Sequence, residues 1–88
     1  MKATTSSRAV TEGFTKILAV TFPQHDDNRA AIYQGYKDGK PCWELVQITK
    51  NWKGGKSRQI QSTTVKAKGA QWIKDFNQFV TDGVAVHA

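Results

Sequence analysis

The fold is decided within residues 57–83, SRQIQSTTVKAKGAQWIKDFNQFVTDG, where the period of the apolar residues changes at Gly69. Before Gly69 the chain is polar and β-branched, which is typical of a strand with one solvent-facing side. After Gly69 five apolar residues fall on one face of a helix: Trp72, Ile73, Phe76, Phe79 and Val80. We expect these five to be core or dimer contacts, in a helix that ends near Asp82-Gly83, where glycine is a natural C-terminal cap.

The segments upstream of this helix predict four strands. In chain order they cover about residues 14–22, which end at Pro23, and then about residues 29–37, 42–52 and 57–65. Between the second and third strands of the chain, Lys37-Asp38-Gly39-Lys40 predicts a tight hairpin, because Asp-Gly supplies the positive φ of a primed turn.

Two of these strands have an irregular alternation. In residues 14–22 the apolar positions share one parity, which is interrupted only by Lys16. In the third strand the apolar residues are at odd positions as far as Leu45 and at even positions from Val46 onward. Either a bulge changes the parity near Leu45, or both faces of this strand are partly covered.

The order of elements predicts an α+β fold, a four-stranded antiparallel sheet followed by a C-terminal helix. We expect a flexible tail at residues 1–12, one domain at 13–83 and a short C-terminal tail at 84–88. Four strands make a sheet roughly 15–19 Å wide, whereas one helix is about 10 Å across. A second helix from a partner subunit would complete the layer, so we expect a homodimer.

The charge is concentrated in one segment of the 88-residue chain, whose net charge is +6. Residues 37–68 hold eight Lys and Arg against two acids, which accounts for the entire net charge, and no acid lies between Glu44 and Asp75. Such a bias favours a polyanionic partner, most often nucleic acid. The alternative is a solvated surface that is merely rich in lysine.

Several other classes of protein are excluded or disfavoured. Cys42 is the only cysteine, so no intrachain disulfide forms and an intracellular, reducing compartment is expected. No apolar run approaches the ~20 residues of a membrane span. His25 has no second His or Cys at ligand spacing, and no carboxylate pair or nucleophile–base pair is present. We therefore expect no metal, no cofactor, no membrane and no enzymatic activity.

Aromatic residues alternate with the basic ones in the charged segment, and this combination is typical of proteins that bind single strands. Cations follow the phosphates while flat rings stack on unpaired bases, which a duplex does not expose. Tyr36 adjoins the hairpin and Trp52 adjoins a Gly-Gly loop, so both are expected to be exposed. For Tyr33 and Trp43 a core position and a ligand-facing position both stay open.

The order of strands, hairpin, basic loop and helix in this chain resembles that of the positive cofactor four family of transcriptional coactivators. The likeness covers roughly residues 28–82 and is carried by five short segments, none of them specific alone. These are Tyr36-Lys37-Asp38-Gly39-Lys40, Trp52 at the end of a long strand, the basic residues 53–58, Thr64-Val65-Lys66-Ala67, and Ala70-Gln71-Trp72. The compact length favours a phage or bacterial member.

The resemblance implies a homodimer whose helices pack together and whose two strongly curved sheets form channels for single-stranded DNA. The stacking residues of the family fall on Tyr36 and Trp52. Its phosphate-binding cations fall on Lys37, Lys40, Lys56 and Arg58. The charge argument adds Lys50 and Lys53 to this set.

The expected function is sequence-independent binding of single-stranded DNA in replication, recombination or transcription, with proteins of those processes as further partners. One alternative is an RNA-binding module that uses the same surface. Another is a protein-interaction module whose basic, aromatic face meets an acidic partner, such as a host polymerase or nuclease that it inhibits.

Overall fold

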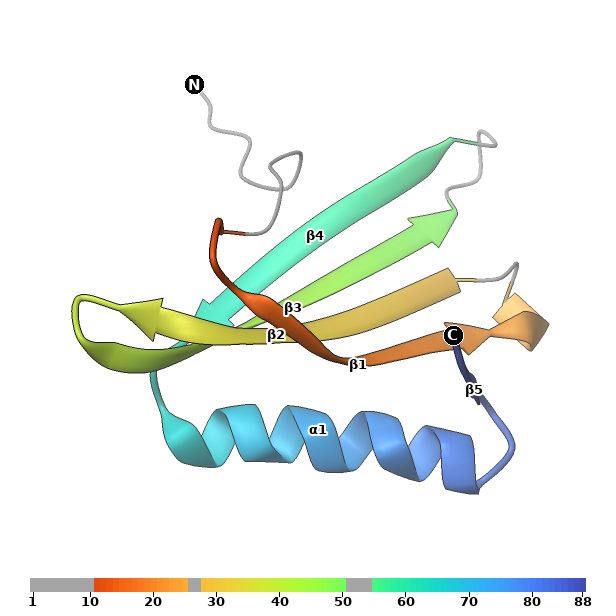
Figure 1. The fold of residues 1–88 in the computed structure, drawn as a ribbon. Coiled ribbons are helices and arrows are strands. Elements are labelled where there is room, and N and C mark those ends of the chain that lie inside the picture. Colours follow the sequence, from red (N-terminus) through yellow and green to blue (C-terminus); the bar gives the residue numbers. More distant parts are fainter. Residues whose placement is uncertain (1–10, 26–27, 51–54) are drawn as a thin grey trace.

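A computed structural model describes residues 11–25, 28–50 and 55–88 of the chain. Within these residues a single antiparallel sheet, with strand order β4-β3-β2-β1-β5, lies over one long helix (Figure 1). The elements, in chain order, are β1 (Thr15–Phe22), the short 3-10 helix η2 (Pro23–His25), β2 (Asn28–Lys37), β3 (Lys40–Lys50), β4 (Lys56–Thr63), α1 (Lys66–Thr81) and β5 (Val86–His87). The predicted α+β class, an antiparallel sheet followed by a helix, is confirmed.

The predicted number of four strands is wrong, because the described residues form five. β1 to β4 are a simple meander, and α1 then carries the chain back beneath the sheet to its other edge (Figure 1). There β5 pairs antiparallel with β1, with Val20 opposite His87 and Thr21 opposite Val86. Part of the expected C-terminal tail is therefore the fifth strand, and Ala85 just before it is fully buried.

The hairpin between β2 and β3 is formed as predicted. Asp38 has φ 53° and Gly39 has φ 77°, so both central residues of the turn are in the left-handed region that a type I′ turn requires. Lys37 and Lys40 are the last paired residues on either side of it.

A β-bulge in β1 explains the interruption at Lys16. Lys16 pairs with Tyr33 and Leu18 pairs with Ile32, so Ile17 is one extra residue on β1. The extra residue reverses the alternation at that point. Lys16 therefore shares a face with Tyr33, opposite to the face on which Leu18 and Val20 meet the helix.

The irregular alternation of β3 arises because both faces of the strand are partly covered, and not from a bulge. β3 pairs with β2 and β4 in unbroken register, so it holds no bulge, and apolar residues lie on both of its faces. Trp43 and Leu45 belong to the core beneath the sheet, whereas Val46 and Ile48 face the opposite side and line a hollow there.

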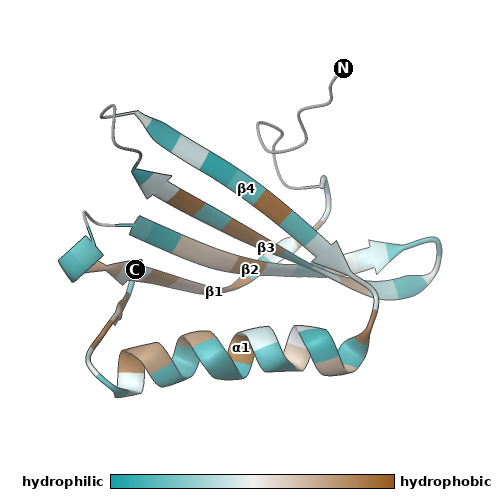
Figure 2. Ribbon diagram, turned by 180° about the vertical axis from the view of Figure 1, so that it is seen from behind, coloured by the Kyte–Doolittle hydropathy of each residue, from teal (hydrophilic) through white to brown (hydrophobic). Residues whose placement is uncertain are grey.

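The core lies between α1 and the facing side of the sheet. Trp72 and Phe76 from α1 pack with strand residues such as Val20, Ile32 and Leu45. Figure 2 shows hydrophobic positions on both α1 and the strands of the sheet. α1 approaches closely because Gly69 has no side chain: a Cβ added there would lie 2.5 Å from Cδ2 of Trp43. The helix begins at Lys66, three residues before the change of period, and ends at Thr81 with Gly83 at φ 80° just beyond it. No helix among the described residues is long and apolar enough to cross a membrane.

The part of the sheet that α1 leaves uncovered on its own side is polar. By strand alternation, β4 and the end of β3 carry there a row of amide and hydroxyl residues: Gln47, Thr49, Gln59, Gln61 and Thr63. Such a surface does not need to be buried, so one helix serves a sheet wider than itself.

Candidate nucleic-acid interface

The candidate site is the face of β1–β4 that lies opposite α1, here called the open face. The register of the strands fixes its composition, because paired residues share a face. One cross-strand row consists of Thr21, Arg29, Ile48 and Arg58. The next row consists of Ala19, Ala31, Val46 and Ile60. The third row consists of Lys16, Tyr33, Glu44 and Ser62.

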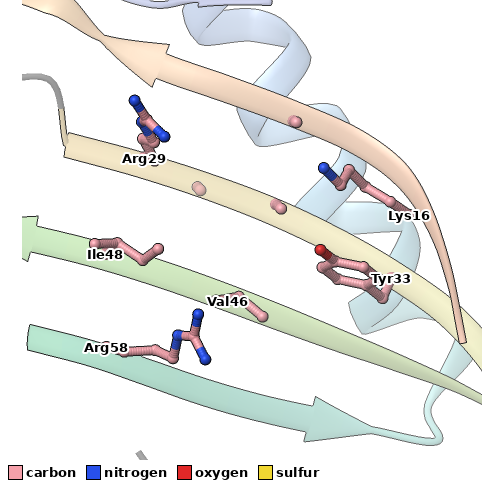
Figure 3. A pocket seen from close by; sticks show the side chains of 9 residues that line it. Lys16, Arg29, Tyr33, Val46, Ile48 and Arg58 are labelled. Atoms are coloured by element: carbon pink, nitrogen blue, oxygen red, sulfur yellow. The ribbon is translucent and has the colours of Figure 1, made fainter. Parts of the chain in front are cut away.

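A hollow of about 430 Å³ lies on the open face across these rows. Ala19 and Ala31 contribute only methyl groups to the middle row, so the larger side chains of the flanking rows stand above them. Figure 3 shows Lys16 and Tyr33 at one end of this hollow, with Arg29 and Arg58 toward the other end. Val46 and Ile48 form the apolar part of its floor (Figure 3).

The charged side chains of the strands are almost all positive. The five strands hold seven Lys and Arg residues and one acid, Glu44. Five of the cations lie around the hollow or at the adjacent end of β3 and β4 on the same face, and we call them the basic rim: Lys16, Arg29, Lys50, Lys56 and Arg58. An anion approaching this part of the open face meets no exposed carboxylate from the strands.

Glu44 is removed from the surface by the N-terminal segment. Its side chain is 8% exposed. Its Oε1 accepts a hydrogen bond from the Thr11 N–H at 3.0 Å, and its Oε2 accepts one from the Thr11 hydroxyl at 2.7 Å. Thr11, which falls in the expected tail at residues 1–12, is therefore attached to the open face; residues 1–10 lie outside the described residues.

The same segment crosses the open face between the hollow and the hairpin. The ring of Phe14 lies against Gly35, where any side chain would collide with it. Gly35 is the next open-face position after Tyr33 toward the hairpin, and Glu44 is the register partner of Tyr33 on β3. Residues 11–14 thus separate the hollow from the hairpin end of the sheet.

The structure brings some of the predicted site residues together and separates others. Lys50 pairs with Lys56, and Arg58 lies two residues along β4 on the same face. Lys37 and Lys40 are a register pair at the hairpin on the open face, whereas Tyr36, which is 70% exposed, pairs with Pro41 on the opposite face. Lys40 and Lys50 are the two ends of β3, so roughly 30 Å of strand separates the groups. Trp52 and Lys53 lie outside the described residues.

The predicted core or dimer residues of α1 all pack within the one chain. Trp72 and Phe76 are buried, and Ile73 and Val80 pack against them from the edge. Phe79 is 37% exposed, and its ring makes edge-to-face contacts with Phe22 at 5.5 Å and Phe76 at 5.6 Å.

Trp43 and Tyr33, for which a core and a ligand-facing position were both open, lie on opposite faces of the sheet. Trp43 is a core residue, 7% exposed, on the side of the sheet that faces α1. Tyr33 lies on the open face and lines the hollow.

Sequence reasoning did not place Lys16 or Arg29 in the site. The sequence signal for Arg29 was its shared parity with Tyr33. For Lys16 it was the broken alternation of the first strand.

Comparisons of the chain with protein-family models, with curated proteins and with solved structures find no match.

Proposed function

We propose that the open face binds single-stranded DNA without sequence specificity, and that the protein acts in replication, recombination or transcription. The observation that carries the proposal is the hollow on the open face, which is lined by one aromatic ring, by apolar side chains and by three cations: Lys16, Arg29 and Arg58. The phosphates of a strand would meet the basic rim. Its unpaired bases would lie over the hollow, away from water.

The composition of this face supports a single strand rather than a duplex. Cations alone would serve either, since phosphates are exposed in both. Tyr33, Val46 and Ile48 add a surface that attracts the flat faces of bases, and those faces are covered in a duplex. The contacts involve no donor–acceptor pattern unique to one base, so sequence independence is expected.

We also propose that the protein is a homodimer. This proposal is supported by apolar surface that the single chain leaves uncovered: Phe79 is 37% exposed, and Val86 on the edge strand β5 is 49% exposed. The chain has a mass of 9.8 kDa. Light scattering at micromolar concentration should give twice that mass, and the monomer mass would contradict a homodimer.

The experiment that tests the function is a titration of fluorescent oligo-dT at several salt concentrations. Each phosphate neutralised on a single strand contributes about −0.7 to the slope of log K against log salt. Engagement of all five cations of the basic rim therefore predicts a slope of about −3.5.

Competitors separate the other functions in the same assay. A matched duplex should compete poorly. Equal or better competition by a matched RNA oligomer would favour the RNA-binding alternative. Absence of oligo-dT binding at ~50 mM salt would reject the proposed function and favour an acidic protein partner.

A further inference from the structure

The hollow exists because of two alanines in the middle of the sheet. Ala19 on β1 and Ala31 on β2 are register partners on the open face. Along β2, Ala31 lies midway between Arg29 and Tyr33, which are roughly 13 Å apart. A larger residue at either alanine would fill this space, so the sequence itself leaves the hollow open.

Tyr33 is the one aromatic side chain among the residues that line the hollow. Phe22, on the helix side, makes ring contacts with His25, Phe76 and Phe79. Among the described residues the Tyr33 ring stacks on no other ring, and its hydroxyl has no hydrogen-bond partner. The ring is half-buried and lines the hollow, so part of its surface is accessible to a ligand there.

We propose that the hollow is a subsite for one unpaired base, which stacks on Tyr33 above the methyl groups of Ala19 and Ala31. This inference rests on the proposed function and assigns the base contact on the open face to one residue. Lys16 lies at the Tyr33 end and Arg29 at the other, so cations are placed for the phosphates on both sides of the base (Figure 3).

The sharpest test fills the hollow without removing a ring or a charge. Ala31→Leu places three additional carbon atoms where the base would lie, and leaves Tyr33 and the basic rim intact. Loss of one base–ring stack corresponds to an affinity for oligo-dT about 5- to 150-fold lower. Ala70→Leu, the same substitution at an exposed position of α1, is the matched control and should bind as the wild type does.

A second measurement needs no variant at all. In NMR titrations of the wild-type protein with oligo-dT, a stacked base should shift the methyl resonances of Ala19 and Ala31 through its ring current. The methyl resonance of Ala70 should stay in place. Tyr33→Leu, which keeps apolar volume without an aromatic ring, should weaken binding by the same 5- to 150-fold range, whereas Tyr33→Phe should retain it.

The outcomes separate this inference from the proposed function. If wild-type protein binds oligo-dT while Ala31→Leu binds equally well and the two methyl resonances do not move, the subsite is rejected and the function stands. If Tyr33→Leu fails to fold, as judged by circular dichroism, Ala31→Leu and the methyl shifts still decide the matter. If the wild-type protein does not bind oligo-dT, the proposed function itself is rejected.

Discussion

Thr11 holds both carboxylate oxygens of Glu44, one through its backbone N–H and the other through its hydroxyl. Glu44 is the only acid in the five strands, and it lies on the face that otherwise collects cations. A carboxylate exposed there would repel phosphates. The contact therefore links the order of the N-terminal segment to the charge of the open face.

Replacing Thr11 with Val should lower the free energy of unfolding by about 1–2 kcal/mol. The substitution keeps the shape and the N–H donor, but it leaves Oε2 of the largely buried Glu44 without its partner. Urea unfolding followed by circular dichroism measures the change. In a double-mutant cycle with Glu44→Ala, a coupling energy near zero would contradict an interaction between the two side chains.

Lys16 and Arg29 should each contribute one phosphate contact. Lys16→Ala or Arg29→Ala is expected to reduce the magnitude of the salt slope for oligo-dT by about 0.7. The control is Lys74→Ala, which removes an exposed cation from α1 on the far side of the sheet. If all three variants change the slope equally, the binding is a general effect of net charge rather than of the open face.

The two groups of predicted cations should behave differently. The Lys50→Ala, Lys56→Ala double variant removes a register pair at the basic rim and should reduce the salt slope by about 1.4. The Lys37→Ala, Lys40→Ala double variant carries the same change in charge at the hairpin, beyond the segment that crosses the open face. Its slope should stay close to that of the wild type, and the reverse order would move the binding surface to the hairpin.

Gly69→Ala should destabilise the protein by about 1–2 kcal/mol, although alanine is the better helix former. Helix propensity alone favours alanine by about 1 kcal/mol. The added Cβ, however, would lie 2.5 Å from the Trp43 ring, and overpacking of a core typically costs about 1–3 kcal/mol or more. Thermal unfolding measures the result, with Ala70→Gly at the neighbouring exposed position as the comparison for propensity. A stabilised Gly69→Ala variant would show that the sheet and helix separate easily.

Structural features that depend on residues close together in the chain could be predicted from the sequence. The hairpin follows from Asp38 and Gly39 because both positive φ values lie in two adjacent residues. The helix face follows from spacing alone. The start of α1 at Lys66 could not be predicted, because Val65 provides no side-chain cap and the first turn carries no apolar residue with helical spacing.

Structural features that depend on pairing between distant parts of the chain could not be predicted from the sequence. β5 is two residues long, and its only evidence is its pairing with Val20 and Thr21, more than sixty positions away. The site has the same limit. Tyr33 and Arg29 share a face by parity, but only the packing of α1 decides which face of β2 is open.

The bulge at Ile17 has a consequence for how this surface can change. In a regular strand, Lys16 and Leu18 would share a face, because they are two residues apart. The bulge takes Ile17 out of the alternation, so Lys16 lies on the open face while Leu18 faces the helix. A change that kept all three residues but removed the bulge would turn the lysine toward the apolar interior. The local pairing of β1 therefore decides the charge of this surface as much as the identity of its residues does.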